Sequence, residues 1–63
     1  MPLKQYRTAA GLSQSQLAKV SGVSLAMIQF YEQGARDINK AEALTVYKLA
    51  QALSCKMEDL INK

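Results

Sequence analysis

Apolar residues recur along this chain at the spacing of α-helices, and no segment shows the period-two alternation of a β-strand. The clearest stripe follows the i, i+3, i+4, i+7 rule and consists of Val46, Leu49, Ala50 and Leu53. Such a stripe predicts a helix with one side against a core. Shorter stripes of the same kind occupy the other segments, so the pattern predicts an all-α fold.

Three glycines divide the chain into helical segments. Gly11, Gly22 and Gly34 can each adopt the left-handed backbone that terminates a helix. The segments predicted to be helical are residues 2–10, 14–21, 24–33, 40–53 and 57–62.

Residues suited to the N-cap precede three of these segments. Ser13 and Ser24 can each accept a backbone hydrogen bond, and Gln16 completes a capping box with Ser13. Asn39 is expected to cap the fourth helix, with Glu42 in its first turn favourable to the helix dipole.

The segment of about residues 14–33 is the most informative. Two helices of about eight residues are joined there by a short turn around Gly22, which is the arrangement of a helix-turn-helix. The small side chain of Ala18 stands where the two helices should cross. The plainer alternative is an ordinary small helical bundle with a glycine turn.

The composition leaves room for one domain, residues 1–63, and disfavours enzymatic chemistry. A chain of 63 residues buries only about 60% of its unfolded surface. It has no His and one Cys, which excludes the usual zinc sites, a disulfide within the chain and histidine-based acid–base catalysis. We therefore expect no enzyme, no metal and no cofactor, and we interpret Cys55 as a small, partly buried apolar residue.

The chain shows no targeting or membrane signal. No apolar run approaches the ~18 residues of a membrane span, and no signal peptide is visible. We expect a cytoplasmic protein with no membrane association.

The net charge of +3 is unevenly distributed. Residues 1–40 carry five basic against two acidic side chains, whereas residues 41–63 carry three of each. This basic excess fits a polyanionic partner such as nucleic acid, and it fits equally a charged surface that keeps the protein soluble.

The segment GLSQSQLAKVSGVS, followed by YEQG, INKAEALTVYKLAQAL and MEDLI, resembles the Cro and phage-repressor type of helix-turn-helix family, also called the xenobiotic-response-element (XRE) family. The resemblance extends from Leu3 to Ile61. It implies a compact five-helix, lambda-repressor-like DNA-binding domain whose third helix lies in the major groove. It also implies a transcription regulator that binds double-stranded DNA as a homodimer, and it leaves any effector ligand unknown.

The resemblance assigns roles to individual positions. The residues implied to face the bases are Leu25, Ala26, Gln29 and Phe30. The residues implied to contact phosphates are Ser13, Gln14, Ser15, Gln33, Arg36 and Lys40. Arg7 and Glu32 are implied to form a partly buried, structural ion pair.

Three of the four base-facing positions are apolar, so that only Gln29 can make bidentate hydrogen bonds to a base. In a first explanation, the apolar residues contact thymine methyl groups and DNA shape adds to specificity. In a second, Leu25, Ala26 and Phe30 form a protein-binding patch on a domain that has lost base readout. In a third, Phe30 folds back and fills a gap in the core. Met27 belongs either to this patch or to the contact with the second helix.

The C-terminal third departs from the family pattern. Ser54 stands where relatives often carry Gly, and Lys56 stands where Ser or Thr usually caps the fifth helix. We therefore expect the last helix to be the least stable element.

Dimerisation is expected because so few basic residues make too few phosphate contacts for tight binding. We expect the contact between copies on the fourth and fifth helices. Tyr47 belongs either to the core or to that contact.

Overall fold

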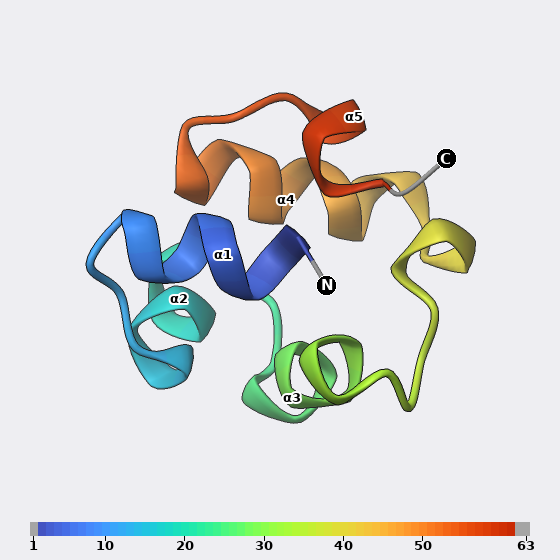
Figure 1. Cartoon of the computed structure of the whole chain (residues 1–63), viewed down its shortest axis with the longest axis horizontal. Coiled ribbons are helices and arrows are strands. Elements are labelled where there is room, and N and C mark those ends of the chain that lie inside the picture. The colour runs from blue at the N-terminus through green and yellow to red at the C-terminus, as the bar shows by residue number, and fades with distance from the viewer. Residues whose placement is uncertain (1, 62–63) are drawn as a thin grey trace.

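The computed structural model describes residues 2–61, and within that range all regular structure is helical (Figure 1). The elements are α1 (Pro2–Ala9), α2 (Gln14–Ser21), α3 (Leu25–Gln33), a single 3-10 turn η1 (Ile38–Lys40), α4 (Ala43–Leu53) and α5 (Met57–Leu60). The predicted all-α class and five-helix order are confirmed.

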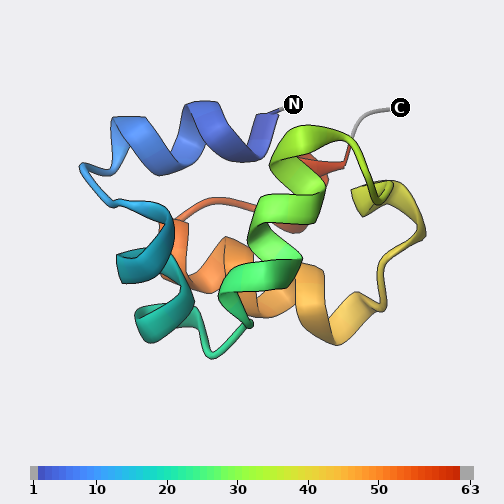
Figure 2. The ribbon, with the colours of Figure 1, turned by 90° about the horizontal axis from the view of Figure 1, so that it is seen from below.

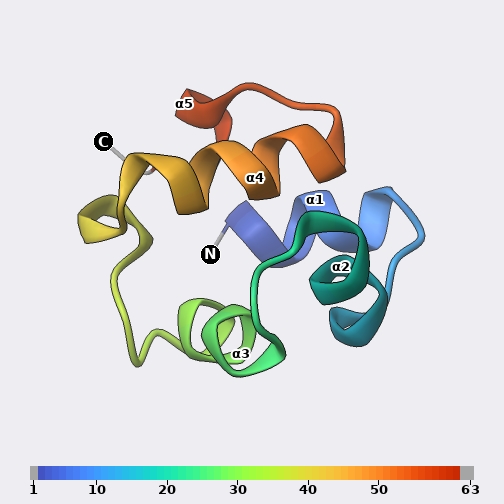
Figure 3. The same cartoon turned by 180° about the vertical axis from the view of Figure 1, so that it is seen from behind.

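The helices stack so that α3 lies on one side of the molecule and α4 and α5 on the opposite side, as Figures 1 and 3 show. α2 packs against both α3 and α4, while α1 packs against α3 and α5. Seen from below in Figure 2, α3 crosses in front of α4. This arrangement leaves the outer side of α3 uncovered by other helices.

One core joins all the helices. The stripe predicted on α4 is buried as expected. The buried hydrophobic residues are Leu3, Leu17, Val23, Ile28, Tyr31, Ile38, Val46, Leu49, Ala50, Leu53 and Leu60. Ile38 lies outside any periodic stripe, which is why the hydrophobic pattern gives no sign of its burial.

The predicted caps of α2 and α3 are confirmed. The Ser13 hydroxyl accepts a hydrogen bond from the Gln16 N–H at 3.1 Å, and the Ser13 N–H donates to Gln16 Oε1 at 2.8 Å. The Ser24 hydroxyl accepts from the Met27 N–H at 3.2 Å. Gly34 ends α3 in the left-handed conformation.

The predicted start of α4 is wrong. The helix begins at Ala43, and Glu42 is its N-cap residue without a side-chain cap hydrogen bond. The preceding residues form the turn η1, in which the Ala41 N–H donates to the Ile38 carbonyl at 3.1 Å and Ile38 enters the core. This burial, which a local cap signal cannot anticipate, displaces the helix start beyond Asn39, whose side chain lies outside what the structure describes.

The end of α4 and the start of α5 depart from standard capping. Ser54 has φ 55°, ψ 41°, a left-handed backbone that a side chain disfavours. The Lys56 N–H donates to Asp59 Oδ2 at 3.0 Å, but an ammonium group has no lone pair with which to accept a bond in return. α5 ends at Leu60 because Ile61 is extended, so the predicted helix is too long; position 62 lies outside the described residues.

Cys55 is half-buried and packs against the core, in agreement with its interpretation as a small apolar residue. Burial, followed by the nearby Asp59 carboxylate, raises the pKa of the Cys55 thiol. Since the thiolate is the reactive form, this environment makes the sulfur a poor nucleophile at neutral pH.

Candidate nucleic-acid interface

The turn between α2 and α3 depends on Gly22. This residue has φ 77°, and its N–H donates to the Ala18 carbonyl at 3.0 Å. A Cβ on Gly22 would meet no atom within 4 Å, so that the need for glycine is conformational rather than steric. Ala18 is half-buried and packs against the core, as expected for a small residue at the helix crossing. The predicted helix-turn-helix is therefore present.

α3 presents one side to the core and the other to solvent. Ile28 and Tyr31 are buried, whereas Leu25 and Phe30 are each 38% exposed and Ala26 is exposed between them. The Ser24 cap fixes the first turn of this helix and with it the direction of the three exposed side chains.

The exposure of Phe30 and Met27 decides two alternatives that the sequence left open. Phe30 reaches solvent, so the explanation that it fills a gap in the core is wrong. Met27 is half-buried and packs against the core, so it does not extend the exposed patch. Gln29, the polar member of the base-facing set, is half-buried rather than fully exposed.

Phe30 is in contact with a cation. The left-handed residue Gly34 turns the chain so that the N–H groups of Ala35 and Arg36 donate to the Phe30 carbonyl at 2.9 and 3.2 Å. The guanidinium carbon of Arg36 then lies 5.7 Å from the centroid of the Phe30 ring. This distance is within the range of a cation–π interaction.

The residues implied to contact phosphates come from the start of α2, the end of α3 and the loop that follows. The exposed members of this set are Ser13, Ser15, Gln33, Arg36 and Lys40. Gln14 is half-buried because its side chain turns toward α3, where Nε2 donates to Glu32 Oε1 at 2.9 Å. This bond places the start of α2 beside the last turn of α3.

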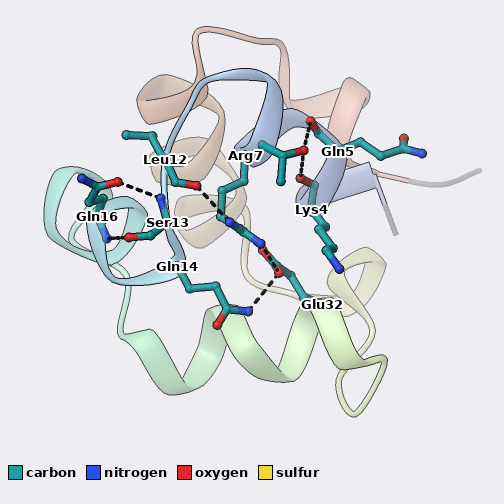
Figure 4. Close-up of polar contacts among 9 residues, drawn as sticks. Lys4, Gln5, Arg7, Leu12, Ser13, Gln14, Gln16 and Glu32 are labelled. Atoms are coloured by element: carbon teal, nitrogen blue, oxygen red, sulfur yellow. Dashed lines mark hydrogen bonds and ion pairs between the residues drawn. The ribbon is translucent and has the colours of Figure 1, made fainter.

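Arg7 and Glu32 are brought together in a bidentate ion pair beneath that junction (Figure 4). Arg7 Nε lies 2.7 Å from Glu32 Oε2, and Nη2 lies 3.0 Å from Oε1. Nη1 donates to the Leu12 carbonyl at 2.9 Å. The two side chains are only 11% and 4% exposed, so the pair ties α1 to α3 away from water.

The network keeps both partners charged. Burial acts to raise the pKa of Glu32, but the hydrogen bonds from Arg7 and Gln14 outweigh it, and the pKa is lowered. The hydrogen bond to Glu32 raises the pKa of Arg7. Since one of its two amide hydrogens is committed to Glu32, Gln14 is restrained at the protein surface with its second N–H and its carbonyl oxygen still available.

The Gln14–Glu32 bond and the Arg36–Phe30 contact are the features of this site that sequence reasoning did not identify. No local signal links Gln14 to Glu32, 18 residues away. A signal for the second contact does exist, since Gly34 ends α3 and reverses the chain between an aromatic and a basic residue.

Within residues 2–61, no helix has the length and apolar character needed to cross a membrane. The same range holds no group of three or more His, Cys, Asp or Glu side chains placed to bind a metal.

Comparison with known protein families gives a match that covers nearly the whole chain. The model of a helix-turn-helix family matches residues 3–60. Neither curated proteins nor solved structures give a match. The matched range contains α2, the Gly22 turn, α3 and the helices that support them. The chain therefore belongs to the Cro and phage-repressor type of helix-turn-helix family, whose members bind double-stranded DNA and regulate transcription.

Proposed function

We propose that this protein is a sequence-specific transcription regulator that reads the DNA major groove with α3. The observation that carries the proposal is the orientation of α3, with Ile28 and Tyr31 in the core and Leu25, Ala26 and Phe30 facing solvent. An exposed helix of this kind fits the width of the major groove.

Polar groups border that helix where the DNA backbone would pass. The proposed phosphate contacts are Ser13, Gln14, Ser15, Gln33, Arg36 and Lys40. The Gln14–Glu32 hydrogen bond holds the start of α2 beside the end of α3, so the groups at those two places lie next to each other. Contacts of this type set the register of the protein on DNA and leave sequence readout to α3.

Base readout by this helix is expected to be modest. Leu25, Ala26 and Phe30 offer apolar contacts suited to thymine methyl groups, and Gln29 alone offers an amide. Because Gln29 is half-buried, direct hydrogen bonds to bases are few. The preferred sites should therefore be rich in A·T pairs, with DNA shape contributing to selection.

We propose that the protein acts as a homodimer, because one small domain with few cations binds DNA weakly at physiological salt. Leu44 and Tyr47 are 62% and 49% exposed and lie one turn apart on α4. The exposure of Tyr47 excludes the core alternative and supports the expected contact between copies. Sedimentation should show a dimer that Tyr47→Glu weakens, whereas a wild-type monomer at high concentration contradicts the proposal.

The experiment that tests DNA reading is selection of duplexes from a random ~30-bp pool at ~0.1 M salt, followed by sequencing. We expect an inverted repeat with half-sites about one helical turn apart. Ala26→Asp should abolish enrichment by placing a carboxylate on the exposed side of α3. Ala9→Asp is the matched control, since it makes the same change at an exposed position of α1, outside both the proposed DNA surface and the proposed contact between copies.

A second function is favoured by the exposure of apolar side chains on α3. Leu25, Ala26 and Phe30 would also suit a protein-interaction domain that has lost base readout. In that case selection yields no enriched sequence and only weak, salt-sensitive binding. Phe30→Arg strengthens nonspecific DNA binding under either function, but abolishes binding of a protein partner only under the second.

A further inference from the structure

We infer that Phe30 acts on DNA binding through Arg36: its ring is a platform that orients the guanidinium toward a DNA phosphate at the end of α3. The inference rests on the proposed DNA-binding function and changes the role of one residue within it. Phe30 becomes a positioning residue whose contribution is independent of base sequence, rather than a contact to thymine.

The backbone after α3 brings the two side chains together. Gly34, at φ 80°, ends the helix and reverses the chain. The Ala35 and Arg36 N–H groups then converge on the Phe30 carbonyl at 2.9 and 3.2 Å. These bonds fix where the Arg36 side chain begins, close to the Phe30 ring.

The contact leaves the binding edge of the arginine free. A cation–π contact needs no hydrogen bond, so it does not use up the five N–H donors of the guanidinium. At 5.7 Å from the ring centroid, Arg36 therefore retains the paired donors that suit a phosphate. Arg36 is exposed, so the ring limits the conformations of a long side chain that would otherwise be mobile in solvent.

Lys40 supplies an internal comparison. It is exposed in η1, four residues after Arg36, and belongs to the same proposed phosphate-contacting set. Its contribution to DNA binding should not depend on Phe30.

The test is a double-mutant cycle on the full chain. Binding is measured at low salt to two duplexes of about 24 bp, one of A·T pairs and one of G·C pairs that lacks thymine methyl groups. The variants are Phe30→Leu, which keeps an apolar side chain but removes the ring, Arg36→Gln and Lys40→Gln, alone and in pairs. Phe30→Tyr retains the ring, and circular dichroism verifies that every variant is folded.

We expect Phe30→Leu to weaken binding by about two- to five-fold on both duplexes, the range of an exposed cation–π contact. The loss should disappear when Arg36 is already Gln and persist when Lys40 is Gln. Phe30→Tyr should bind like the wild type. In the free protein, the NMR signals of the Arg36 side chain should move on Phe30→Leu, because the ring current is lost.

Three results overturn the inference. A loss confined to the A·T duplex assigns Phe30 to thymine methyl contact, and additive effects of Phe30→Leu and Arg36→Gln separate the two residues. If the NMR signals of the Arg36 side chain do not change in Phe30→Leu, the ring does not orient the guanidinium. In each of these cases the wild type still binds DNA and the proposed function stands, whereas a wild type that binds neither duplex overturns both.

Discussion

The two helices of the helix-turn-helix, α2 and α3, are capped differently from α4 and α5. α2 and α3 each begin at a serine whose hydroxyl accepts a backbone N–H, and each ends at a left-handed glycine. α4 and α5 begin at Glu42 and Lys56, whose side chains accept no cap bond, and α4 ends at Ser54 in a left-handed conformation. Directional local bonds are thus concentrated where the orientation of an exposed helix matters.

The second region depends on burial instead. Val46, Leu49, Ala50 and Leu53 of α4 and Leu60 of α5 lie in the core. Burial of this kind is non-directional and roughly proportional to area, so it holds helices together without defining their ends. Substitutions in the first region therefore remove specific hydrogen bonds, whereas substitutions in the second can add cap bonds that are missing.

The largest expected effect comes from breaking the ion pair that ties α3 of the first region to α1. Arg7→Ala or Glu32→Ala should lower the free energy of unfolding by about 3 kcal/mol, because one buried charge is left unpaired. Urea denaturation measures the loss. Lys48→Ala removes an exposed charge from α4 and is the control. A loss no greater than that of the control would show that the network does not stabilise the fold.

The same pair should make stability depend on acid pH. The pKa of Glu32 is lower in the folded than in the unfolded protein, so its contribution is complete above the ordinary value of about 4.5 and is lost as pH falls through the folded value. The difference in unfolding free energy between wild type and Glu32→Gln should therefore shrink on acidification. Glu58→Gln, at an exposed site, is the control. A gap that stays constant down to pH 3 contradicts the prediction.

A residue better suited to the end of α4 should stabilise the second region. Ser54→Gly should raise the free energy of unfolding by about 1 kcal/mol, because glycine adopts φ 55° without the cost of a side chain. Thermal unfolding measures the shift. Ser54→Ala keeps a Cβ and should give no gain, so equal melting temperatures for the glycine and alanine variants would exclude backbone strain at this position.

A smaller gain is expected at the start of α5. Lys56→Ser should raise the free energy of unfolding by about 0.5–1 kcal/mol, since a hydroxyl can accept the Asp59 N–H while Asp59 keeps its bond to the N–H of residue 56. Lys48→Ser makes the same change inside a helix and should not stabilise. An unchanged melting temperature for Lys56→Ser would count against a capping role for this position.

Sequence reasoning succeeds where the determining interactions are local. The ends of α2 and α3 follow from Ser13, Ser24, Gly22 and Gly34, each of which acts on its own helix. The start of α4 does not follow from a local cap residue, because burial of Ile38 in the common core creates an extra turn before the helix.

The same distinction applies to the candidate site. The exposure of Leu25, Ala26 and Phe30 follows from helical periodicity once the buried stripe of α3 is known. The bond from Gln14 to Glu32 depends on how α2 docks beside α3, and a pattern of residue types carries no measure of that docking.

The division of α3 into a buried and an exposed side also has a use in protein engineering. Ser24 caps the helix and Ile28 and Tyr31 hold it against the core, and these roles do not involve Leu25, Ala26 or Phe30. Leu25 and Ala26 can therefore be randomised in a combinatorial library with little cost to folding. Under the proposed function, the same independence would let new target sequences evolve while the scaffold is retained and only the outermost side chains are exchanged.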